Sequence, residues 1–340
     1  MQAVLSGLWV NVGLLLGSAV VIYLACEFFV NGVEWVGHRM AVGQKATGTI
    51  LAAFGTALPE SVVTLVAVAF GAGAASKELG VGAALGGPLA LSTVAYATVG
   101  VTLLLAGRRL PQTAAMLAEF RHLSRDQGWF LCIFVCKVGL GVLAFAWKPW
   151  LGIAFLAAYA LYVRQEIGAE GDTEAEELEP LKFQPNAAEP ATLVAAAQTL
   201  AALVVIFLAS RTFVAQLSAL GPALGLPPQL LALLLSPIAT ELPETMNAII
   251  WVRQGKYQLA LANISGAMMI QATIPTALGL FFTPWHLTPP LLVAAGATMV
   301  AIAVMFVAFR RGFVARWLLA AMGLLYPVFA VVIAALHLAR

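Results

Sequence analysis

Two glutamates occupy positions where carboxylates are rare, inside apolar stretches and directly after a proline. Glu60 follows Pro59, and Glu244 follows Pro243. A charged carboxylate inside a membrane helix costs at least about 2.5 kcal/mol, so such a residue usually has a partner and a function. A proline has no N–H, so each one frees a backbone carbonyl one turn earlier in a helix. Carboxylate and carbonyl oxygens are the hard ligands that Ca²⁺ binds.

The surroundings of the two glutamates recur at a fixed offset. Sliding the sequence by 184 positions aligns GTALPE, residues 55–60, with ATELPE, residues 239–244, without a gap. The same offset aligns residues 24–37 with residues 208–221 and makes Thr56 equivalent to Thr240. One copy alone would fit a proline-kinked helix with a protonated, hydrogen-bonded glutamate. Two copies at one offset favour an ion site instead.

The composition is that of a polytopic membrane protein. The chain has 340 residues, of which 61% are hydrophobic and 10% are charged, and its mean hydropathy is +0.94. Soluble proteins are about one-quarter charged. A net charge of +2 with scattered basic residues excludes nucleic acid as a partner. The three cysteines lie in apolar runs without a CxxC motif, which is typical of packing rather than redox chemistry.

Ten apolar stretches come close to the length of about 20 residues that a membrane helix needs. They lie near residues 8–36, 47–72, 79–105, 128–146, 149–164, 192–220, 228–252, 258–282, 288–309 and 313–336. If the N-terminus lies outside, the connections on the inner side of the membrane hold thirteen basic residues, from Arg39 to Arg316. The outer side then holds only Lys77, Lys148 and Arg340. The excess of basic residues marks the cytoplasmic side. We therefore predict an all-α integral protein of an inner or plasma membrane, with both termini outside the cytoplasm.

An acidic connection divides the ten spans into two halves. Residues 165–191 hold eight of the sixteen acidic residues, a composition typical of a disordered linker. We predict a first five-helix repeat at residues 1–164, a cytoplasmic linker at residues 165–191 and a second repeat at residues 192–340. Because each half has an odd number of spans, the second half enters the membrane from the opposite side. Such inverted repeats place an ion site at the midplane, where the halves meet.

At these motifs the sequence resembles the cation/calcium exchanger superfamily, which includes the sodium/calcium exchangers. The family carries a GTSxPE motif on one helix of each repeat and a GNxxGSNxxN-like motif on the next. Here GTALPE is followed by GAALGGPLAL, residues 82–91, and ATELPE by ANISGAMMIQ, residues 262–271. The resemblance implies that Glu60 and Glu244 are the central cation ligands, with Thr56 and Thr240 beside them.

The motifs also depart from the family pattern. The second hydroxyl of GTS corresponds to Ala57 in one repeat and to Glu241 in the other. With a four-residue insertion between Gly71 and Glu78, the ligands of the partner helices correspond to Gly87, Leu91, Ala267 and Gln271. Only Gln271 keeps a side-chain oxygen, which weakens the implied coupling to Na⁺. Glu241 adds a third acid, as a proton carrier or as a ligand that adapts the site to another divalent ion.

A polar stripe lies on the first helix, where Glu27, Asn31 and Glu34 share one face. The stripe fits either a structural hydrogen-bonded seam or an ion or proton path. The repeat offset makes Arg211 equivalent to Glu27, so we predict a salt bridge between the first and sixth helices. Lys137, in the fourth span, is expected to snorkel or to pair with an acid in a structural role rather than to gate transport.

These features predict a secondary antiporter that exchanges a divalent cation, first of all Ca²⁺, for Na⁺ or H⁺ by alternating access. Its expected partners are the lipid bilayer and inorganic cations, and no cofactor is expected. Alternatives are an H⁺-coupled antiporter for Mg²⁺ or Mn²⁺, a passive cation channel, and an intramembrane enzyme that uses the acids. The enzyme interpretation lacks a nucleophile, since no GxSxG, HExxH or phosphate-binding GxxxxGK[ST] motif is present. We therefore expect a transporter and not an enzyme.

Overall fold

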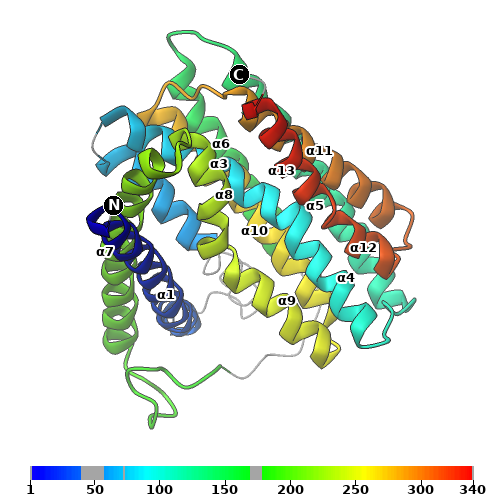
Figure 1. The fold of residues 1–340 in the computed structure, drawn as a ribbon. Helices are drawn as coiled ribbons and strands as arrows, with labels where there is room; N and C mark the ends of the chain where they lie inside the picture. Colours follow the sequence, from blue (N-terminus) through cyan, green and yellow to red (C-terminus); the bar gives the residue numbers. More distant parts are fainter. Residues whose placement is uncertain (1, 40–56, 72, 169–177, 339–340) are drawn as a thin grey trace.

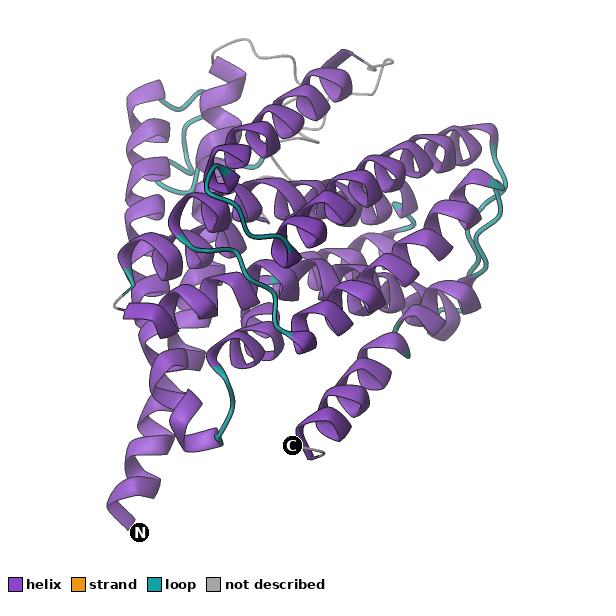
Figure 2. Ribbon diagram, turned by 90° about the horizontal axis from the view of Figure 1, so that it is seen from above, coloured by secondary structure: helices purple, strands orange, loops and turns teal. Residues whose placement is uncertain are grey.

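A computed structural model describes residues 2–39, 57–71, 73–168 and 178–338, which form helices and connections without a strand among them (Figure 2). The elements in chain order (Figure 1) are α1 (Gln2–Arg39), a helix at residues 57–65, the π-helix η1 (Val66–Phe70), α3 (Gly73–Ala90), the π-helix η2 (Leu91–Ala95), α4 (Tyr96–Leu105), α5 (Ala114–Val142), the 3₁₀-helix η3 (Lys148–Trp150), α6 (Leu151–Gly168), α7 (Thr192–Leu224), α8 (Pro228–Thr240), α9 (Leu242–Gln254), α10 (Tyr257–Phe282), α11 (Pro289–Arg310), α12 (Arg316–Met322) and α13 (Leu325–Leu338).

These helices overlap the ten predicted stretches, but α5 begins at Ala114, well before the predicted start at residue 128, and the stretches at residues 228–252 and 313–336 each form two helices. Six helical segments in the described residues are long and apolar enough to cross a membrane, namely Trp9–Val36, Gly73–Leu105, Thr192–Gly221, Tyr257–Phe282, Pro289–Arg310 and Arg316–Ala335. The other predicted spans correspond to the shorter apolar helix Ala57–Phe70, to α5, to α6 and to the pair α8 and α9. The stretch predicted at residues 47–72 falls outside the described residues before position 57.

The connections gather at the two ends of α5. At its start, Arg108 Nη1 donates to the Arg253 carbonyl at 2.8 Å, and Arg316 Nη1 donates to the Arg108 carbonyl at 3.0 Å. We call this the basic end. At its far end, Lys148 Nζ donates to the carbonyls of Leu143 at 2.7 Å and Trp285 at 3.3 Å. The 29 residues of α5 separate the two ends by about 43 Å. The basic end thus joins the connections that hold Arg108, Arg253 and Arg316. The excess of basic residues assigns all three connections to the cytoplasmic side.

Burial separates central helices from peripheral ones. In α10, 78% of the apolar window is buried, and in the α3–α4 segment 72% is buried. The corresponding values are 33% for α1 and 22% for α7, which pack along each other at one edge of the molecule (Figure 1). The helices that carry the second motif of each repeat therefore form the centre, and the two long first helices form an outer pair.

Glycines allow the central helices to approach closely. A Cβ built on Gly82 of α3 would lie 2.1 Å from the Gln229 carbonyl oxygen at the start of α8. A Cβ on Gly100 of α4 would lie 2.2 Å from the Ala320 backbone nitrogen in α12. Membrane helices use such small residues because close backbone contact gives dispersion energy that lipid tails cannot replace.

Gly100→Ala is expected to destabilise the protein by about 1–3 kcal/mol, because the added methyl group forces α4 away from the α12 backbone. Thermal unfolding of the detergent-purified variant measures this change. Gly139→Ala is the matched control, since Gly139 lies in α5 and a Cβ there meets nothing within 4 Å. That control should be neutral or slightly stabilising. Equal melting temperatures for the two variants would contradict the close approach of α4 and α12.

Candidate functional site

The chain is broken at Glu241, between α8 and α9. Glu241 leaves the helical conformation, with φ −99° and ψ 3°, and its N–H donates to the Pro237 carbonyl at 3.0 Å. Pro243 lies in the first turn of α9, as does the acidic Glu244. A helix start favours a carboxylate because the first N–H groups carry partial positive charge. The predicted break beside an acid is therefore present in the second repeat.

One threonine connects the acids of the two repeats. Thr240 Oγ1 lies 2.8 Å from Glu60 Oε2 and 2.9 Å from Glu241 Oε1. Ser236 Oγ also contacts Glu60 Oε2, at 3.4 Å. All these side chains are buried. The TxxPE motif of the first repeat thus meets the equivalent helix of the second, as the repeat analysis expects.

The acids do not close into a three-carboxylate cluster. Within the described ranges, no three His, Cys, Asp or Glu side chains are placed to hold one metal ion together. Glu60 is joined through Thr240 to Glu241, while Glu244 is fully buried on α9. Thr56 lies outside the described residues, so its role as a ligand stays a prediction.

Gln271 of α10 completes the polar centre from the opposite side. Its Nε2 donates to Glu241 Oε2 at 2.7 Å. A Cβ built on Gly87 of α3 would lie 2.6 Å from Gln271 Oε1 and 3.1 Å from Glu241 Oε1. The absence of a side chain at position 87 therefore makes room for the glutamine and the acid.

The register of the partner helices differs from the expected one. α3 begins at Gly73 and α10 at Tyr257, which are related by the same offset of 184 residues as the TxxPE motifs. Gly87 and Gln271 have this offset as well, and they face each other. The four-residue insertion before Glu78 is therefore wrong. Gly87 corresponds to Gln271 and not to Ala267, because α3 and α10 begin at positions related by the same offset.

Two oxygens of the site have no hydrogen-bond donor among the described residues. They are Glu60 Oε1 and Gln271 Oε1, and both are inaccessible to solvent. Buried polar atoms are nearly always hydrogen-bonded, so orphaned oxygens in a polar centre are candidates for contact with an ion or a water molecule. Glu60, Thr240, Glu241 and Gln271 together provide carboxylate, hydroxyl and amide oxygens, which are ligands suited to Ca²⁺.

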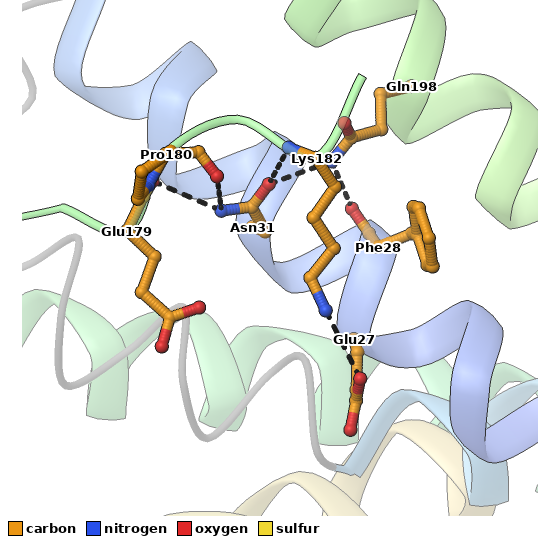
Figure 3. Close-up of polar contacts among 7 residues, drawn as sticks. All are labelled: Glu27, Phe28, Asn31, Glu179, Pro180, Lys182 and Gln198. Atoms are coloured by element: carbon orange, nitrogen blue, oxygen red, sulfur yellow. Dashed lines mark hydrogen bonds and ion pairs between the residues drawn. The ribbon is translucent and has the colours of Figure 1, made fainter. Parts of the chain in front are cut away.

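The polar stripe of α1 contacts the linker rather than this centre (Figure 3). Asn31 Oδ1 accepts from the Lys182 N–H at 2.9 Å and from Gln198 Nε2 of α7 at 3.0 Å. Its Nδ2 donates to the carbonyls of Glu179 and Pro180, both at 3.3 Å. Asn31 therefore joins α1, α7 and the linker, and we call these contacts the linker clasp. Glu34 is half-buried on the same helix.

Glu27 pairs with a residue that the repeat analysis did not consider. Lys182 Nζ lies 3.1 Å from Glu27 Oε2 and 5.0 Å from the Phe28 ring centroid. Arg211 is exposed on α7, and no ion pair joins it to Glu27, although both residues are described. The salt bridge predicted between the first and sixth helices is therefore not formed, and Glu27 pairs with the linker residue Lys182 instead. The expected disorder of the linker is also wrong for residues 178–191, where Leu181 is fully buried against Trp35.

Lys137 lies in the polar centre. It is fully buried in α5, and its Nζ donates to the carbonyls of Ala84 at 2.7 Å and Gln271 at 3.3 Å. Of the two structural roles expected for Lys137, snorkelling is wrong, since none of its surface reaches solvent, whereas a place near an acid agrees with the influence of Glu60 on its ammonium group. No pattern in the sequence indicated its place beside the site.

Comparison with known proteins gives a consistent result. A family model described as sodium/calcium exchanger protein matches residues 10–165 and 194–335. No curated protein matches this sequence. The chain is similar to a solved structure of the sodium-calcium exchanger NCX_Mj, with 17% identity, a TM-score of 0.60, and coverage of 94% of this chain and 96% of the other. It is also similar to the H⁺/Ca²⁺ exchanger CAX, with 16% identity, a TM-score of 0.73, and coverage of 94% and 82%. The fold is thus that of polytopic exchangers with inverted repeats, which confirms the predicted fold class.

Asn31→Ala is expected to lower the free energy of unfolding by about 1–3 kcal/mol, because it leaves buried partners of the linker clasp without hydrogen bonds. Glu27→Gln should cost less than about 1 kcal/mol, since its ion pair with Lys182 is partly exposed. Thermal unfolding of both purified variants measures the difference. A larger loss for Glu27→Gln than for Asn31→Ala would show that the ion pair, and not the buried asparagine, holds the clasp.

Proposed function

This chain belongs to the sodium/calcium exchanger protein family, and we propose that it is a secondary antiporter that exchanges Ca²⁺ for H⁺ by alternating access. Glu60 and Glu241 are the proposed carboxylate ligands, Thr240 and Gln271 add hydroxyl and amide oxygens, and Glu244, at the start of α9, stays a predicted ligand. Thr56 joins this set by the repeat relation.

The observation that carries this proposal is the Thr240 hydroxyl, which lies between carboxylates from opposite repeats. Both carboxylates are buried, so their charge has a high free energy unless a cation or protons neutralise it. A divalent cation meets this need with one ion, and the unsatisfied Glu60 Oε1 offers it a ligand. Mg²⁺ and Mn²⁺ are the alternative cargoes, because the same oxygen types bind them.

The hydrogen-bond inventory supports H⁺ as the counter-ion. A threonine hydroxyl has a single hydrogen to donate. Thr240 Oγ1 is nevertheless within hydrogen-bond distance of Glu60 Oε2, of Glu241 Oε1 and of the Ser236 carbonyl. Both carboxyl contacts of Thr240 are hydrogen bonds only when at least one of the two carboxyls carries a proton and donates it to the hydroxyl. Protons need only these carboxyls, whereas Na⁺ needs further oxygens, and Gly87 and Ala267 provide no side-chain oxygen.

The arrangement of the helices suggests how access alternates. α1 and α7 form the outer pair, and both contact α8, which ends beside the break at Glu241. Sliding of this pair along the central helices would change which side of the membrane reaches Glu244 and the break at Glu241. Protons and the divalent cation occupy the same carboxylates, so one must leave before the other binds, which produces exchange. A passive channel would conduct without this competition.

Glu60→Gln should reduce ⁴⁵Ca²⁺ uptake into proteoliposomes at least about tenfold, because it removes a buried carboxylate ligand. Uptake is driven by a pH gradient in one set of vesicles and by a Na⁺ gradient in another, and we expect only the first to drive it. Glu78→Gln, on the exposed surface of α3, is the matched control and should transport normally.

Uptake that needs neither gradient would indicate a channel, and uptake driven by Na⁺ alone would contradict H⁺ exchange. If neither gradient drives ⁴⁵Ca²⁺ uptake but Mg²⁺ or Mn²⁺ moves in the same vesicles, the cargo assignment is wrong.

Glu241→Gln tests the proton exchange directly. Binding of Ca²⁺ to the wild-type protein should release protons, which a pH-sensitive dye detects in weakly buffered detergent solution. The variant keeps the contacts with Thr240 and Gln271 but has no carboxyl proton to release at this position. We expect fewer protons released per bound Ca²⁺ and slower uptake under a pH gradient. Unchanged proton release and unchanged cation preference would exclude Glu241 from the exchange.

A further inference from the structure

Lys137 has the surroundings of a bound cation. Its Nζ contacts the carbonyl oxygens of Ala84 and Gln271 at 2.7 and 3.3 Å. The ring centroids of Phe134 and Trp285 lie 5.3 and 5.9 Å from the same nitrogen. Trp285 is held in place by its own Nε1, which donates to the Lys137 carbonyl at 3.1 Å. Carbonyl oxygens and aromatic faces are all groups that attract positive charge.

Two prolines explain why these carbonyls face the lysine. Pro88 follows Ala84 by four residues in α3, and Pro275 follows Gln271 by four residues in α10. Because proline has no N–H, the carbonyl four residues before it loses its helical donor. Each central helix therefore exposes one oxygen that needs a partner. A single ammonium group from α5 satisfies both oxygens.

The same ammonium lies beside the proposed cation site. It interacts electrostatically with the Glu60 carboxylate. Gln271 connects the two sites, since its carbonyl accepts from Lys137 while its side-chain amide donates to Glu241. With Glu244, the acids of this region have a formal charge of −3 when all of them are deprotonated, and Lys137 reduces it to −2. That charge equals the charge that one divalent cation neutralises.

We propose that Lys137 is a tethered monovalent cation, which permanently fills a monovalent position next to the divalent site. This inference rests on the proposed function and deepens it. Because the chain itself supplies this positive charge, the protein binds its divalent cation without a co-bound Na⁺ or K⁺. The competing explanation is a purely structural clamp between α3 and α10. A clamp would affect stability but would create no dependence on monovalent ions when it is removed.

Lys137→Ala opens the position and is the decisive variant. In N-methylglucamine buffer, its affinity for ⁴⁵Ca²⁺ should rise at least about tenfold, because loss of the ammonium group leaves the acids with a formal charge of −3. NaCl should return the affinity to within about threefold of wild type, since a small cation can replace the ammonium group. The purified variant should also gain saturable ²²Na⁺ binding, measured by scintillation proximity, which the wild type lacks.

Two further variants separate charge from packing. Lys148→Ala is the matched control, because Lys148 is also buried and its Nζ donates to the carbonyls of Leu140, Leu143 and Trp285. It lies at the far end of α5, so its loss should lower the melting temperature without creating Na⁺ dependence. Lys137→Arg keeps the charge and should bind ⁴⁵Ca²⁺ independently of Na⁺. Wild-type Ca²⁺ affinity in Lys137→Ala, with no effect of Na⁺, would overturn the proposal.

The wild-type protein decides the question if Lys137→Ala does not fold. Replacement of all Na⁺ and K⁺ by N-methylglucamine should change wild-type ⁴⁵Ca²⁺ affinity less than about twofold, because no monovalent ion has to bind. A larger loss would overturn the tethered cation. Complete absence of ⁴⁵Ca²⁺ binding would contradict the proposed function instead, and saturable ²²Na⁺ binding to the wild-type protein would overturn the tethered cation.

Discussion

Removal of carboxylates from water is the constraint on which the centre of this protein depends. An isolated buried charge is too costly to persist, so each one requires an opposite charge, a hydrogen-bond donor or a proton. Glu60 and Glu241 share the hydroxyl of Thr240, and Glu241 also receives the amide of Gln271. These partners neutralise the carboxylates incompletely, and this is useful in a transporter. If every carboxylate oxygen already had a hydrogen-bond donor or an opposite charge, binding of a cation would lower the free energy little.

Broken and tightly packed helices make this arrangement possible. The break at Glu241 turns the acid toward Thr240 and Gln271, which a continuous helix could not do for adjacent residues. The close approach of α3 to α8 and α10 depends on positions without a side chain, such as Gly82 and Gly87. Backbone carbonyls freed by proline then become ligands themselves. Glycine and proline, which weaken isolated helices, thus create the polar centre of this membrane protein.

The sequence alone predicted the features that depend on local patterns or on the internal repeat. The predicted apolar stretches overlap helices wherever the structure describes them, although α5 begins well before the predicted start of its span, and the TxxPE motifs led to Glu60, Thr240 and Glu241. The sequence alone did not predict contacts between residues far apart in the chain. Lys137 meets Gln271, which is 134 residues away, and Lys182 meets Glu27 across 155 residues. The prolines do signal which carbonyls lose their donors, but no sequence pattern shows that one lysine reaches both. The division at residues 165–191 stays a prediction of the repeat analysis.

The pairing of each repeat with the other has a consequence for biosynthesis. Glu60 meets its hydroxyl partner 180 residues later in the chain. At translation rates of about 5–20 residues per second, this delay lasts roughly 9–36 s. During this time the first half is already synthesised, and its buried acid has no Thr240 to contact. The hydrogen bond from Lys137 to Ala84 spans only 53 residues and can form within the first half. The nascent first half must therefore be sheltered by the insertion machinery or by local water until the second half arrives.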